Sequence, residues 1–470
     1  MSKRTERNRP TLTNGKNREM QLQLKPYQPH YKALAQLGIP IIIGQIGSIV
    51  LGFADTLMIG RHSTAELGAA AFVNNMFVLV LIFAMGFAYG LTPIVGSLYG
   101  REECGKIGAI LKNSLVANTL LAMVLMGIMT VLYLNLGNLG QPEELLPLMR
   151  PYFIVNLISV PFVTWFNTFK QLSDGTTDTK TPMWILLGGN LLNIVGNYVL
   201  IYGKFGFPEL GLYGAGLSTM FSRIVMAVAF CVVFFGTRRY RVYRQGFHSE
   251  PINSADISHL CKIGFPLSLQ MGMEAAAFSL SSIMVGWIGT TALAAHQVML
   301  TISQFFYMVY YGMGSAVAVR ASYFTGQHDY TAVRRTASAG FHLILAIAVA
   351  VSVPVVIWRN SLGFIFTDSP QVCTLVAQVI IPLIIYQFGD GMQCTYGNAL
   401  RGIAYVKPLM YTAFLAYFVI SLPLGYLFGI KMGLGLLGIW FAFPFGLTTA
   451  GLLYYYYFHK RLKEVWPDNR

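Results

Sequence analysis

Twelve long apolar runs alternate with short polar stretches along the chain. Each run is about as long as a tilted helix needs to cross the hydrocarbon core of a bilayer, which is roughly 20 residues. Because the polar stretches are short, consecutive helices are expected to be antiparallel. The pattern predicts an all-α integral membrane protein with twelve transmembrane helices. The predicted spans lie near residues 34–60, 70–97, 109–135, 149–170, 182–203, 213–236, 260–288, 296–322, 337–358, 375–399, 408–430 and 434–458.

Composition agrees with this membrane assignment. Of the 470 residues, 55% are hydrophobic and only 11% are charged, whereas a soluble domain carries about 25% charged residues. The net charge of +14 could indicate a nucleic-acid partner. However, the basic residues gather at the ends of the apolar runs, which is typical of membrane topology, so no nucleic-acid partner is expected. The five cysteines have no C-x-x-C spacing, so neither a disulfide framework nor a zinc site is predicted.

The distribution of basic residues predicts the orientation in the membrane. If the N-terminus is cytoplasmic, 27 Lys and Arg lie in or beside cytoplasmic segments and five lie on the opposite side. The positive-inside rule then places both termini in the cytoplasm. No cleavable signal peptide is visible in the basic N-terminal tail, so the first span is expected to serve as the membrane signal. The predicted organisation is a basic tail (1–33), a six-helix lobe (34–236), a cytoplasmic linker (237–259), a second six-helix lobe (260–458) and a cytoplasmic tail (459–470).

The two predicted lobes are internal repeats. A shift of 226 residues superimposes glycines and prolines of the first lobe on those of the second without a gap, and these residues mark kinks and close helix contacts. Six spans per copy insert both copies the same way round, which predicts a pseudo-twofold axis along the membrane normal. Two such bundles enclose a cleft that rocking motions could open to each side in turn, as in a transporter. The matched pairs include Gly38/Gly264, Pro40/Pro266, Gly60/Gly286, Gly86/Gly312 and Gly100/Gly326.

Two acids lie deep within predicted spans of the second lobe. Asp390 comes eleven residues before Arg401, or roughly 16 Å along a helix, and Glu274 lies at a similar depth, roughly 18 Å beyond Lys262. A carboxylate at mid-membrane costs roughly 2.5 to 3.5 kcal/mol unless it faces a cavity or a partner. The two acids could therefore meet, with one carrying a proton or both ionised around a bound cation. The alternative is that each acid is a structural group bonded to a neighbouring helix.

Other polar residues share the helix faces of these two acids. Tyr386, Gln387, Gln393 and Cys394 follow three- and four-residue spacing from Asp390, which predicts a polar stripe along one side of the helix. Gln270 lies one turn before Glu274 and could add a ligand oxygen. A polar stripe inside a membrane favours a transport path or a binding site.

The first lobe carries its own set of intramembrane polar residues. Asp55 lies near the outer end of its span, where water can reach a carboxylate at low cost. It could share a pocket with polar residues of the fifth and sixth spans, although interhelical hydrogen bonds would explain those residues equally well. Arg223 could be a counter-charge or could extend to the interface, and His296 at the start of the eighth span is expected to be interfacial. The polar residues in question are Asn190, Asn193, Asn197, Thr219 and Ser222.

Several longer motifs resemble one known family. GFADTLMIG in the first span, SDGTTDTKTP, NYVLIYGKFGFPELGLYGAG, AAHQV and YQFGDGMQ followed by ALRG resemble the multidrug and toxic compound extrusion (MATE) transporters, in particular their NorM-like bacterial branch. The resemblance extends from Leu34 to about Lys460 and implies twelve helices in two six-helix lobes around a central cleft. It implies a cation site at Glu274, Asp390 and Tyr386 in the second lobe. It also implies a polar cluster for cation or proton coupling in the first lobe, formed by Asp55, Asn193, Asn197 and Thr219.

The resemblance implies an antiporter of the bacterial inner membrane that exports amphipathic organic cations in exchange for sodium or protons. The acid pair of the second lobe favours sodium. Abundant Met, Phe and Tyr could line a cleft that accepts varied hydrophobic cations. No nucleotide-binding motif or nucleophile set is present in the sequence, so we expect neither an enzyme nor a cofactor. We expect a monomer.

Three other functions are weighed against this one. The first is a flippase of a lipid-linked precursor, which would need a basic cleft for pyrophosphate, and Arg223 is the one buried base that the sequence offers. The second is a channel, for which the sequence provides no specific support. The third is an intramembrane enzyme, for which no catalytic residues are found. The long basic N-terminal tail differs from short-tailed members of the family, and no role is predicted for it.

Overall fold

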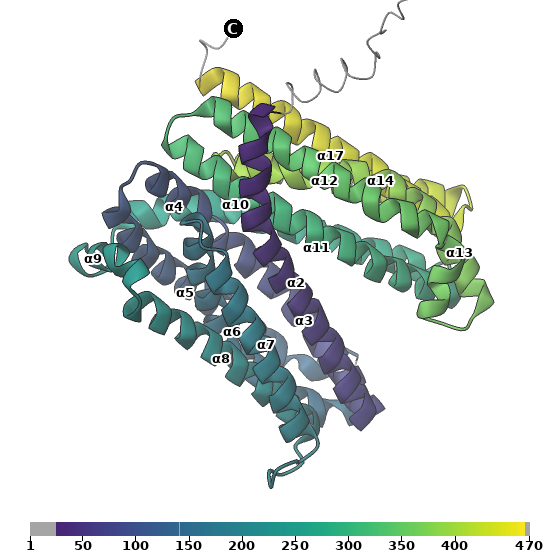
Figure 1. Ribbon diagram of the computed structural model, residues 1–470. Coiled ribbons are helices and arrows are strands. Elements are labelled where there is room, and N and C mark those ends of the chain that lie inside the picture. The colour runs from purple at the N-terminus through teal and green to yellow at the C-terminus, as the bar shows by residue number, and fades with distance from the viewer. Residues whose placement is uncertain (1–24, 141, 466–470) are drawn as a thin grey trace, which may run out of the picture.

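The computed structural model describes residues 25–140 and 142–465, and within these ranges it contains helices and no strands. Twelve of its helices are long and apolar enough to cross a membrane, which confirms the predicted number. Figure 1 shows two groups of helices that diverge from the end of the molecule holding α4 and α9. We call this end the α9 end. The predicted basic tail 1–33 lies outside the described residues up to residue 24.

The first lobe contains the helices up to α8, and a short helical linker follows it. Its elements are η1 (Lys25–Tyr27), α2 (Gln28–His62), α3 (Thr64–Ala88), α4 (Leu91–Gly100), α5 (Cys104–Leu134), η2 (Leu136–Asn138), η3 (Glu143–Leu145), α6 (Leu146–Gly175), α7 (Lys180–Ile201) and α8 (Gly211–Gly236). The linker consists of η4 (Arg238–Tyr240) and α9 (Arg241–Ser249). The sequence predicted only a linker here, so the helix α9 is an addition.

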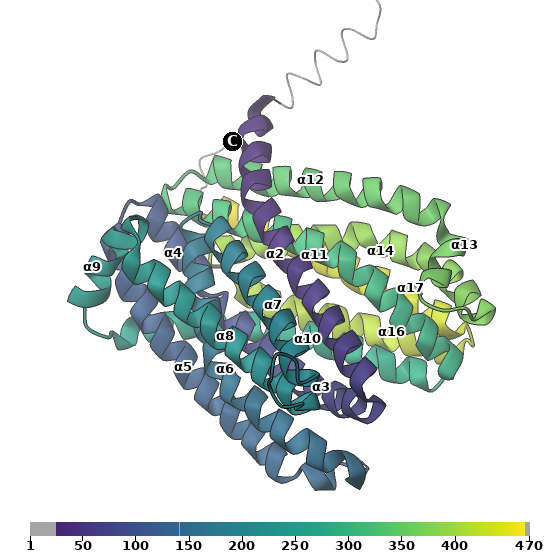
Figure 2. The ribbon, with the colours of Figure 1, turned by 60° about the horizontal axis from the view of Figure 1, so that its bottom comes forward.

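The second lobe begins at α10 and ends at α17. Its elements are α10 (Ser254–Gly286), α11 (Thr290–Gly326), α12 (Tyr330–Ile357), α13 (Arg359–Leu362), η5 (Gly363–Ile365), α14 (Pro370–Gly402), α15 (Lys407–Ala413), η6 (Phe414–Ser421), α16 (Leu422–Tyr426), η7 (Leu427–Lys431) and α17 (Gly435–Val465). In Figure 2, α2 runs along the boundary between the lobes, with α7 on one side and α11 on the other.

Two predicted spans are not single regular helices. The second span breaks at Tyr89 and Gly90, so that α4 is a separate helix. The eleventh span is interrupted by two π-helical segments, η6 and η7. π-Helical turns are rare and often occur at functional sites. Hydropathy detects apolar length and cannot reveal either irregularity.

Repeat-related glycines bring the two lobes into close contact. A Cβ atom on Gly86 would lie 2.6 Å from the Cα of Ser268, and one on its repeat partner Gly312 would lie 2.4 Å from a side-chain carbon of Ile42. The repeat partners Gly100 and Gly326 make equally close contacts. A Cβ atom on Gly100 would lie 2.1 Å from the carbonyl oxygen of Tyr323, and one on Gly326 would lie 2.1 Å from that of Ser97. Residues without a side chain let helices approach closely in membranes. These glycines recur at the same positions in the two repeats because both repeats contribute equivalent close contacts to a symmetric lobe interface.

The linker is fixed to the first lobe by close backbone packing. A Cβ atom on Gly246 of α9 would lie 1.7 Å from the carbonyl oxygen of Gly105 on α5. Likewise, a Cβ atom on Gly108 of α5 would lie 1.8 Å from the carbonyl oxygen of Tyr243 on α9. Only glycine permits this distance between the two helices, so α9 is held directly against the start of α5.

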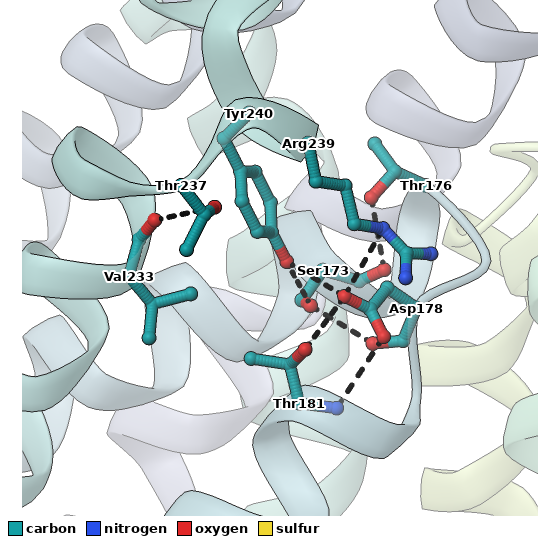
Figure 3. Close-up of polar contacts among 8 residues, drawn as sticks. All are labelled: Ser173, Thr176, Asp178, Thr181, Val233, Thr237, Arg239 and Tyr240. Carbon is teal, nitrogen blue, oxygen red and sulfur yellow. Dashed lines mark hydrogen bonds and ion pairs between the residues drawn. The ribbon is translucent and has the colours of Figure 1, made fainter.

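A polar network ties the linker to the loop after α6, as Figure 3 shows. The Tyr240 hydroxyl donates to Asp178 Oδ2 at 3.1 Å and lies 2.7 Å from Ser173 Oγ, while Thr181 also donates to Asp178 at 2.7 Å. Arg239 Nε lies 3.4 Å from the same carboxylate. Burial raises the pKa of Tyr240 above its ordinary value, so its hydroxyl stays protonated and can donate. The motif SDGTTDTKTP thus stabilises the connection between the lobes.

Candidate functional site

A cleft of about 420 Å³ lies between the two lobes and is lined by residues of both. The second lobe supplies Glu274 from α10 and Asp390 from α14, so both predicted acids line the same cavity. Aromatic and methionine side chains surround them. The lining includes Met85 and Tyr89 of the first lobe and Met271, Phe278, Tyr307, Met308, Tyr311 and Tyr386 of the second.

Two glutamines hold the carboxylate of Glu274. Gln270, one turn earlier on α10, donates to Oε2 at 3.2 Å, and Gln393 on α14 donates to Oε1 at 3.2 Å. The Gln393 amide nitrogen also lies 2.6 Å from the hydroxyl of Tyr417, and its Oε1 has no hydrogen-bond partner in the described part of the chain. A buried amide oxygen without a donor beside a carboxylate is suited to bind a cation.

Asp390 is buried, with 4% of its surface exposed, and within the described part of the chain its one hydrogen-bond contact is a weak one from Cys394 Sγ at 3.7 Å. Neither Asp390 nor Glu274 forms an ion pair with a basic residue among residues 25–140 and 142–465. A buried carboxylate without a basic partner is unfavourable unless it binds a proton or a cation. The arrangement therefore provides two acidic groups, facing one cavity, whose charge an incoming cation can neutralise.

Tyr386 is held in place beside the acids by a chain of contacts through α11 and α17. Its hydroxyl lies 2.6 Å from Ser303 Oγ, and its ring stacks with Trp440 at 6.2 Å between centroids. Trp440 in turn donates to His296 Nδ1 at 3.0 Å, and Ser282 lies 2.9 Å from Nε2. His296 lies near the start of α11, as predicted, but its side chain is fully buried by contacts with α10 and α17. Its position at the start of a span hid this contact, which depends on α17.

Some site residues were not predicted. Tyr417 contacts Gln393 and lies in the π-helical segment η6. No spacing of polar residues in this segment indicates that Tyr417 faces the site. Tyr307 lines the same cleft, and nothing in the spacing distinguished it from the many other aromatic residues. Gln393 belongs to the predicted polar stripe, and its three-residue spacing from Asp390 is the sequence signal for its place in the site.

The structure also brings together the predicted polar cluster of the first lobe. Asn197 on α7 donates to Asp55 Oδ1 on α2 at 2.5 Å and to Asn193 Oδ1 at 3.2 Å, and Asn193 donates to Thr219 on α8 at 3.1 Å. When the Asn193 amide is turned over, its nitrogen faces Asp55 Oδ1 at 2.9 Å and its oxygen accepts from the Thr219 hydroxyl at 3.1 Å. Asp55 therefore receives amide hydrogen bonds, whereas no amide of residues 25–140 or 142–465 donates to Asp390.

Arg223 lies near this cluster but makes no ion pair within the described ranges. Its guanidinium donates to Ser159 Oγ at 2.6 Å and to Asn156 Oδ1 at 3.5 Å, both on α6. Arg223 also interacts electrostatically with Asp55, so the predicted counter-charge role agrees with the structure although the two groups form no ion pair among the described residues. Asn190 is buried as well, and its amide nitrogen has no partner among the described side chains.

Arg223 is not the one buried base, as the sequence suggested. Lys170 and Arg401 have exposed fractions of 8% and 7%. Lys170 forms an ion pair with Asp174 at 2.7 Å, and the Arg401 guanidinium lies 5.0 Å from the centroid of the Tyr89 ring. Both bases lie at the ends of predicted spans, where hydropathy places basic residues at the interface. Contacts between helices bury them instead.

The cleft is closed toward the α9 end. The hydroxyls of Tyr89 and Tyr311 form a hydrogen bond across the two lobes, and Arg401 of the second lobe covers the Tyr89 ring of the first. Beyond them, a Cβ atom on Gly96 of α4 would lie 1.9 Å from Ser322 Oγ of α11. The lobes therefore pack tightly at this end and diverge at the other (Figure 1).

Comparisons with known proteins agree with this architecture. The sequence profile of the MatE family matches residues 40–199 and 266–427. The two matched segments start 226 residues apart, which is the shift of the internal repeat. A probable multidrug resistance protein NorM of Photorhabdus laumondii is 29% identical over 90% of this chain and 94% of its own length. The multidrug resistance protein NorM of Vibrio vulnificus is 28% identical over 91% and 94%.

Solved structures share the same fold. A MATE protein in the straight conformation has a TM-score of 0.84 at 18% identity, covering 93% of this chain and 97% of that chain. The outward-facing conformation of a multidrug resistance MATE family transporter has a TM-score of 0.83 at 18% identity, covering 93% and 96%. These likenesses show that the twelve-helix, two-lobe architecture is shared.

Proposed function

The chain belongs to the MatE family, and from this premise we propose that it is a secondary active multidrug efflux antiporter. In this proposal it exports amphipathic organic cations in exchange for sodium by alternating access. The observation that carries the proposal is the pair Glu274 and Asp390, which face one cleft without a basic partner among the described residues. Two unpaired carboxylates in a low-dielectric cavity attract cations.

The cleft suits an organic cation. The rings of Tyr307, Tyr311 and Tyr386 line it together with methionines, which adapt to ligands of different shape. Aromatic faces attract cations, and the apolar remainder can pack against a hydrophobic body. A site of this kind selects for charge and amphipathic character more than for one molecular shape, as multidrug transport requires.

The oxygen atoms beside Glu274 suit sodium. Hard cations prefer oxygen ligands, and the carboxylates of Glu274 and Asp390 can be supplemented by the unpartnered Oε1 of Gln393. Ion and drug would thus use the same two acids. Binding of one then weakens binding of the other, and this coupling is reciprocal.

We further propose that both termini are cytoplasmic in a bacterial inner membrane, because the basic residues gather at the α9 end. The α9 end is then cytoplasmic, and the cleft of this conformation opens outward. Sodium would enter from outside and release the drug, after which the lobes would rock about the glycine-rich interface and expose the site inward. We expect the monomer to be sufficient, since one chain contains the complete cleft.

The Asp55 cluster is proposed as a second cation or proton site that is not essential for sodium coupling. Asp55 is stabilised by amide hydrogen bonds, so it needs a bound ion less than Asp390 does. A flippase of a lipid-linked precursor is less well supported, even with Lys170 and Arg401 buried. Asp174 neutralises Lys170, and the acids of the cleft would repel a pyrophosphate.

Efflux from proteoliposomes tests this function. The purified protein would be reconstituted with a fluorescent organic cation, and sodium and pH gradients would be imposed separately at clamped voltage. A sodium gradient alone is expected to drive efflux. If only a proton gradient drives it, sodium coupling is wrong and the Asp55 cluster becomes the candidate coupling site. If neither gradient drives transport of any cation, the antiporter proposal is wrong.

A further inference from the structure

The helix α9 lies at the outer edge of the first lobe, beside the beginning of α5 (Figures 1 and 2). Its inner face packs on α5 through Tyr243 and Gly246, which are buried. Its outer face carries polar and basic residues, and Arg238, Arg239, Arg241 and Arg244 fall within seven residues of each other. A short basic amphipathic helix in this position is typical of a segment at the membrane surface.

An apolar groove of about 460 Å³ begins directly at α9 and continues along the outside of the lobe. Its polar groups are satisfied within the protein, because the Trp165 ring nitrogen donates to the Thr119 hydroxyl at 2.8 Å. The groove is therefore suited to an apolar chain. It is lined by Leu115, Val116, Thr119, Leu120 and Met123 of α5, Trp165 and Phe169 of α6, Cys231 and Phe235 of α8, and Phe247 of α9.

The length of the groove corresponds to one leaflet of a bilayer. From Leu115 to Met123, the part of α5 that lines the groove, the helix rises by roughly 12 Å, and Lys112 lies one turn before this part, at the level of α9. The hydrocarbon core of a bilayer is roughly 30 Å thick, so the groove extends from the headgroup region to about the middle of the membrane. One acyl chain of a phospholipid spans the same depth.

Basic side chains surround the surface end of the groove. The Lys112 ammonium lies 5.5 Å from the centroid of the Phe247 ring, which lines the groove. Arg244 donates to the carbonyl oxygens of Phe235 and Thr237 at the end of α8. Arg241, Arg244 and Phe247 follow three-residue spacing, so they lie along one side of α9. Arg241 is exposed and makes no ion pair among the described residues.

We propose that this groove and the basic side of α9 bind one anionic phospholipid. One acyl chain occupies the groove, and the headgroup phosphate contacts Lys112 and Arg241, with Arg244 beside them. Charge complementarity selects an anionic headgroup over a zwitterionic one, because each basic residue near the surface attracts anionic lipid. The lipid bridges α5, α8 and α9, and since α9 belongs to the connection between the lobes, it stabilises that connection.

Native mass spectrometry of the full chain tests the proposal. The protein would be released from nanodiscs that contain equal amounts of phosphatidylglycerol and phosphatidylcholine with identical acyl chains. We expect the first retained lipid to be phosphatidylglycerol. The variant Lys112→Gln/Arg241→Gln should reduce this preference about fivefold for each charge removed. Leu120→Trp, which fills the groove, should reduce retention of both lipids.

The control is Arg335→Gln, an exposed basic residue at the start of α12 in the other lobe. It should leave the preference unchanged. Equal retention of both lipids by the unmodified protein would overturn the proposal, as would a preference that persists in the double variant. If Arg335→Gln reduced the preference for phosphatidylglycerol as much as the double variant does, general surface charge would explain the preference, and this too would overturn the proposal. A dimer that disappears in Leu120→Trp would show that a second copy, not a lipid, occupies the groove.

Discussion

Gln393 on α14 donates a hydrogen bond of 3.2 Å to the carboxylate of Glu274 on α10. Gln393 follows Asp390 by three residues on the same helix, so this bond fixes the position of the two acids relative to each other. The two helices that carry the acids thus form one cation site whose geometry depends on their contact.

The first prediction concerns these acids. Asp390→Asn and Glu274→Gln should each lower sodium-driven efflux at least roughly tenfold, which corresponds to about 1.4 kcal/mol of lost ion binding. Both variants should fold, because neither acid forms an ion pair with a basic residue of the described structure. Efflux rates in proteoliposomes and thermal unfolding of the same preparations provide the measurements. Unchanged efflux in Asp390→Asn would refute the assignment of this site.

Asp55→Asn provides the matched change in the first lobe. Since the proposal places sodium coupling in the second lobe, sodium-driven efflux should remain within about twofold of the unmodified rate, a change of less than about 0.5 kcal/mol. Because the uncharged Asn is a weaker acceptor, the hydrogen bond from Asn197 should weaken, and the free energy of unfolding should fall by about 0.5 to 1.5 kcal/mol. A folded Asp55→Asn protein without sodium-driven efflux would move the coupling site to the first lobe.

The third prediction tests the lobe interface. In Gly100→Ala the new Cβ would lie 2.1 Å from the backbone carbonyl oxygen of Tyr323, and backbone cannot move aside as a flexible side chain can. The conformation closed at the α9 end should therefore lose population, by roughly fivefold for each 1 kcal/mol of strain. Electron–electron distance measurements between spin labels at residues 106 and 327 should show longer distances.

The matched control for this change is Gly127→Ala, since a Cβ at Gly127 meets no atom within 4 Å. It should leave the distance distribution unchanged. If both variants behave alike, close packing at Gly100 does not hold the lobes together at this end.

The fourth prediction concerns the network around Asp178 (Figure 3). Tyr240→Phe removes the hydroxyl that contacts both Asp178 and Ser173, which should lower the free energy of unfolding by about 1 to 3 kcal/mol. Tyr243→Phe alters a neighbouring buried tyrosine outside this network and serves as the control. Unfolding temperatures of the two variants, measured side by side, test the difference. Equal stability of Tyr240→Phe and the unmodified protein would show that the Tyr240 hydroxyl contributes nothing to stability.

Tyr240 also predicts a pH dependence. Burial raises its pKa in the folded protein above the unfolded value of about 10. Above that pH the unfolded chain loses the proton first, so the contribution of Tyr240 to stability is complete below about pH 10 and falls as the pH rises further. The unfolding temperature should decline less steeply in this alkaline range in Tyr240→Phe than in the unmodified protein. Parallel declines would contradict this role of Tyr240.

Much of the fold follows from simple patterns in the sequence. Apolar length predicted all twelve spans. The repeated register of Gly86 with Gly312 and Gly100 with Gly326 predicted close helix contacts, which the structure places at the lobe interface. The depths of Glu274 and Asp390 placed both acids at a similar level because helical rise converts residue number into distance. These predictions succeed because each depends on one helix, or on two repeats with the same geometry.

The remaining features depend on contacts between distant segments. His296 is buried because Trp440 of α17 lies against it, and Arg401 is buried because Tyr89 of the other lobe covers it. A single helix contains no information about which partner it meets. The π-helical turn that presents Tyr417 to Gln393 has no spacing pattern of its own. Hydropathy predicts that Lys170 and Arg401, which lie at the ends of their spans, are near water. In the structure, contacts between helices bury both side chains.

The central claim is that sodium and an organic cation compete for Glu274 and Asp390. The most direct test is equilibrium binding of radioactive sodium to the purified protein, with and without a transported organic cation, in the unmodified chain and in Asp390→Asn. The account predicts that the organic cation displaces sodium, that sodium weakens binding of the organic cation by the same factor, and that Asp390→Asn loses sodium binding. Simultaneous binding of both ligands without mutual effect, or sodium binding that persists in Asp390→Asn, would contradict it.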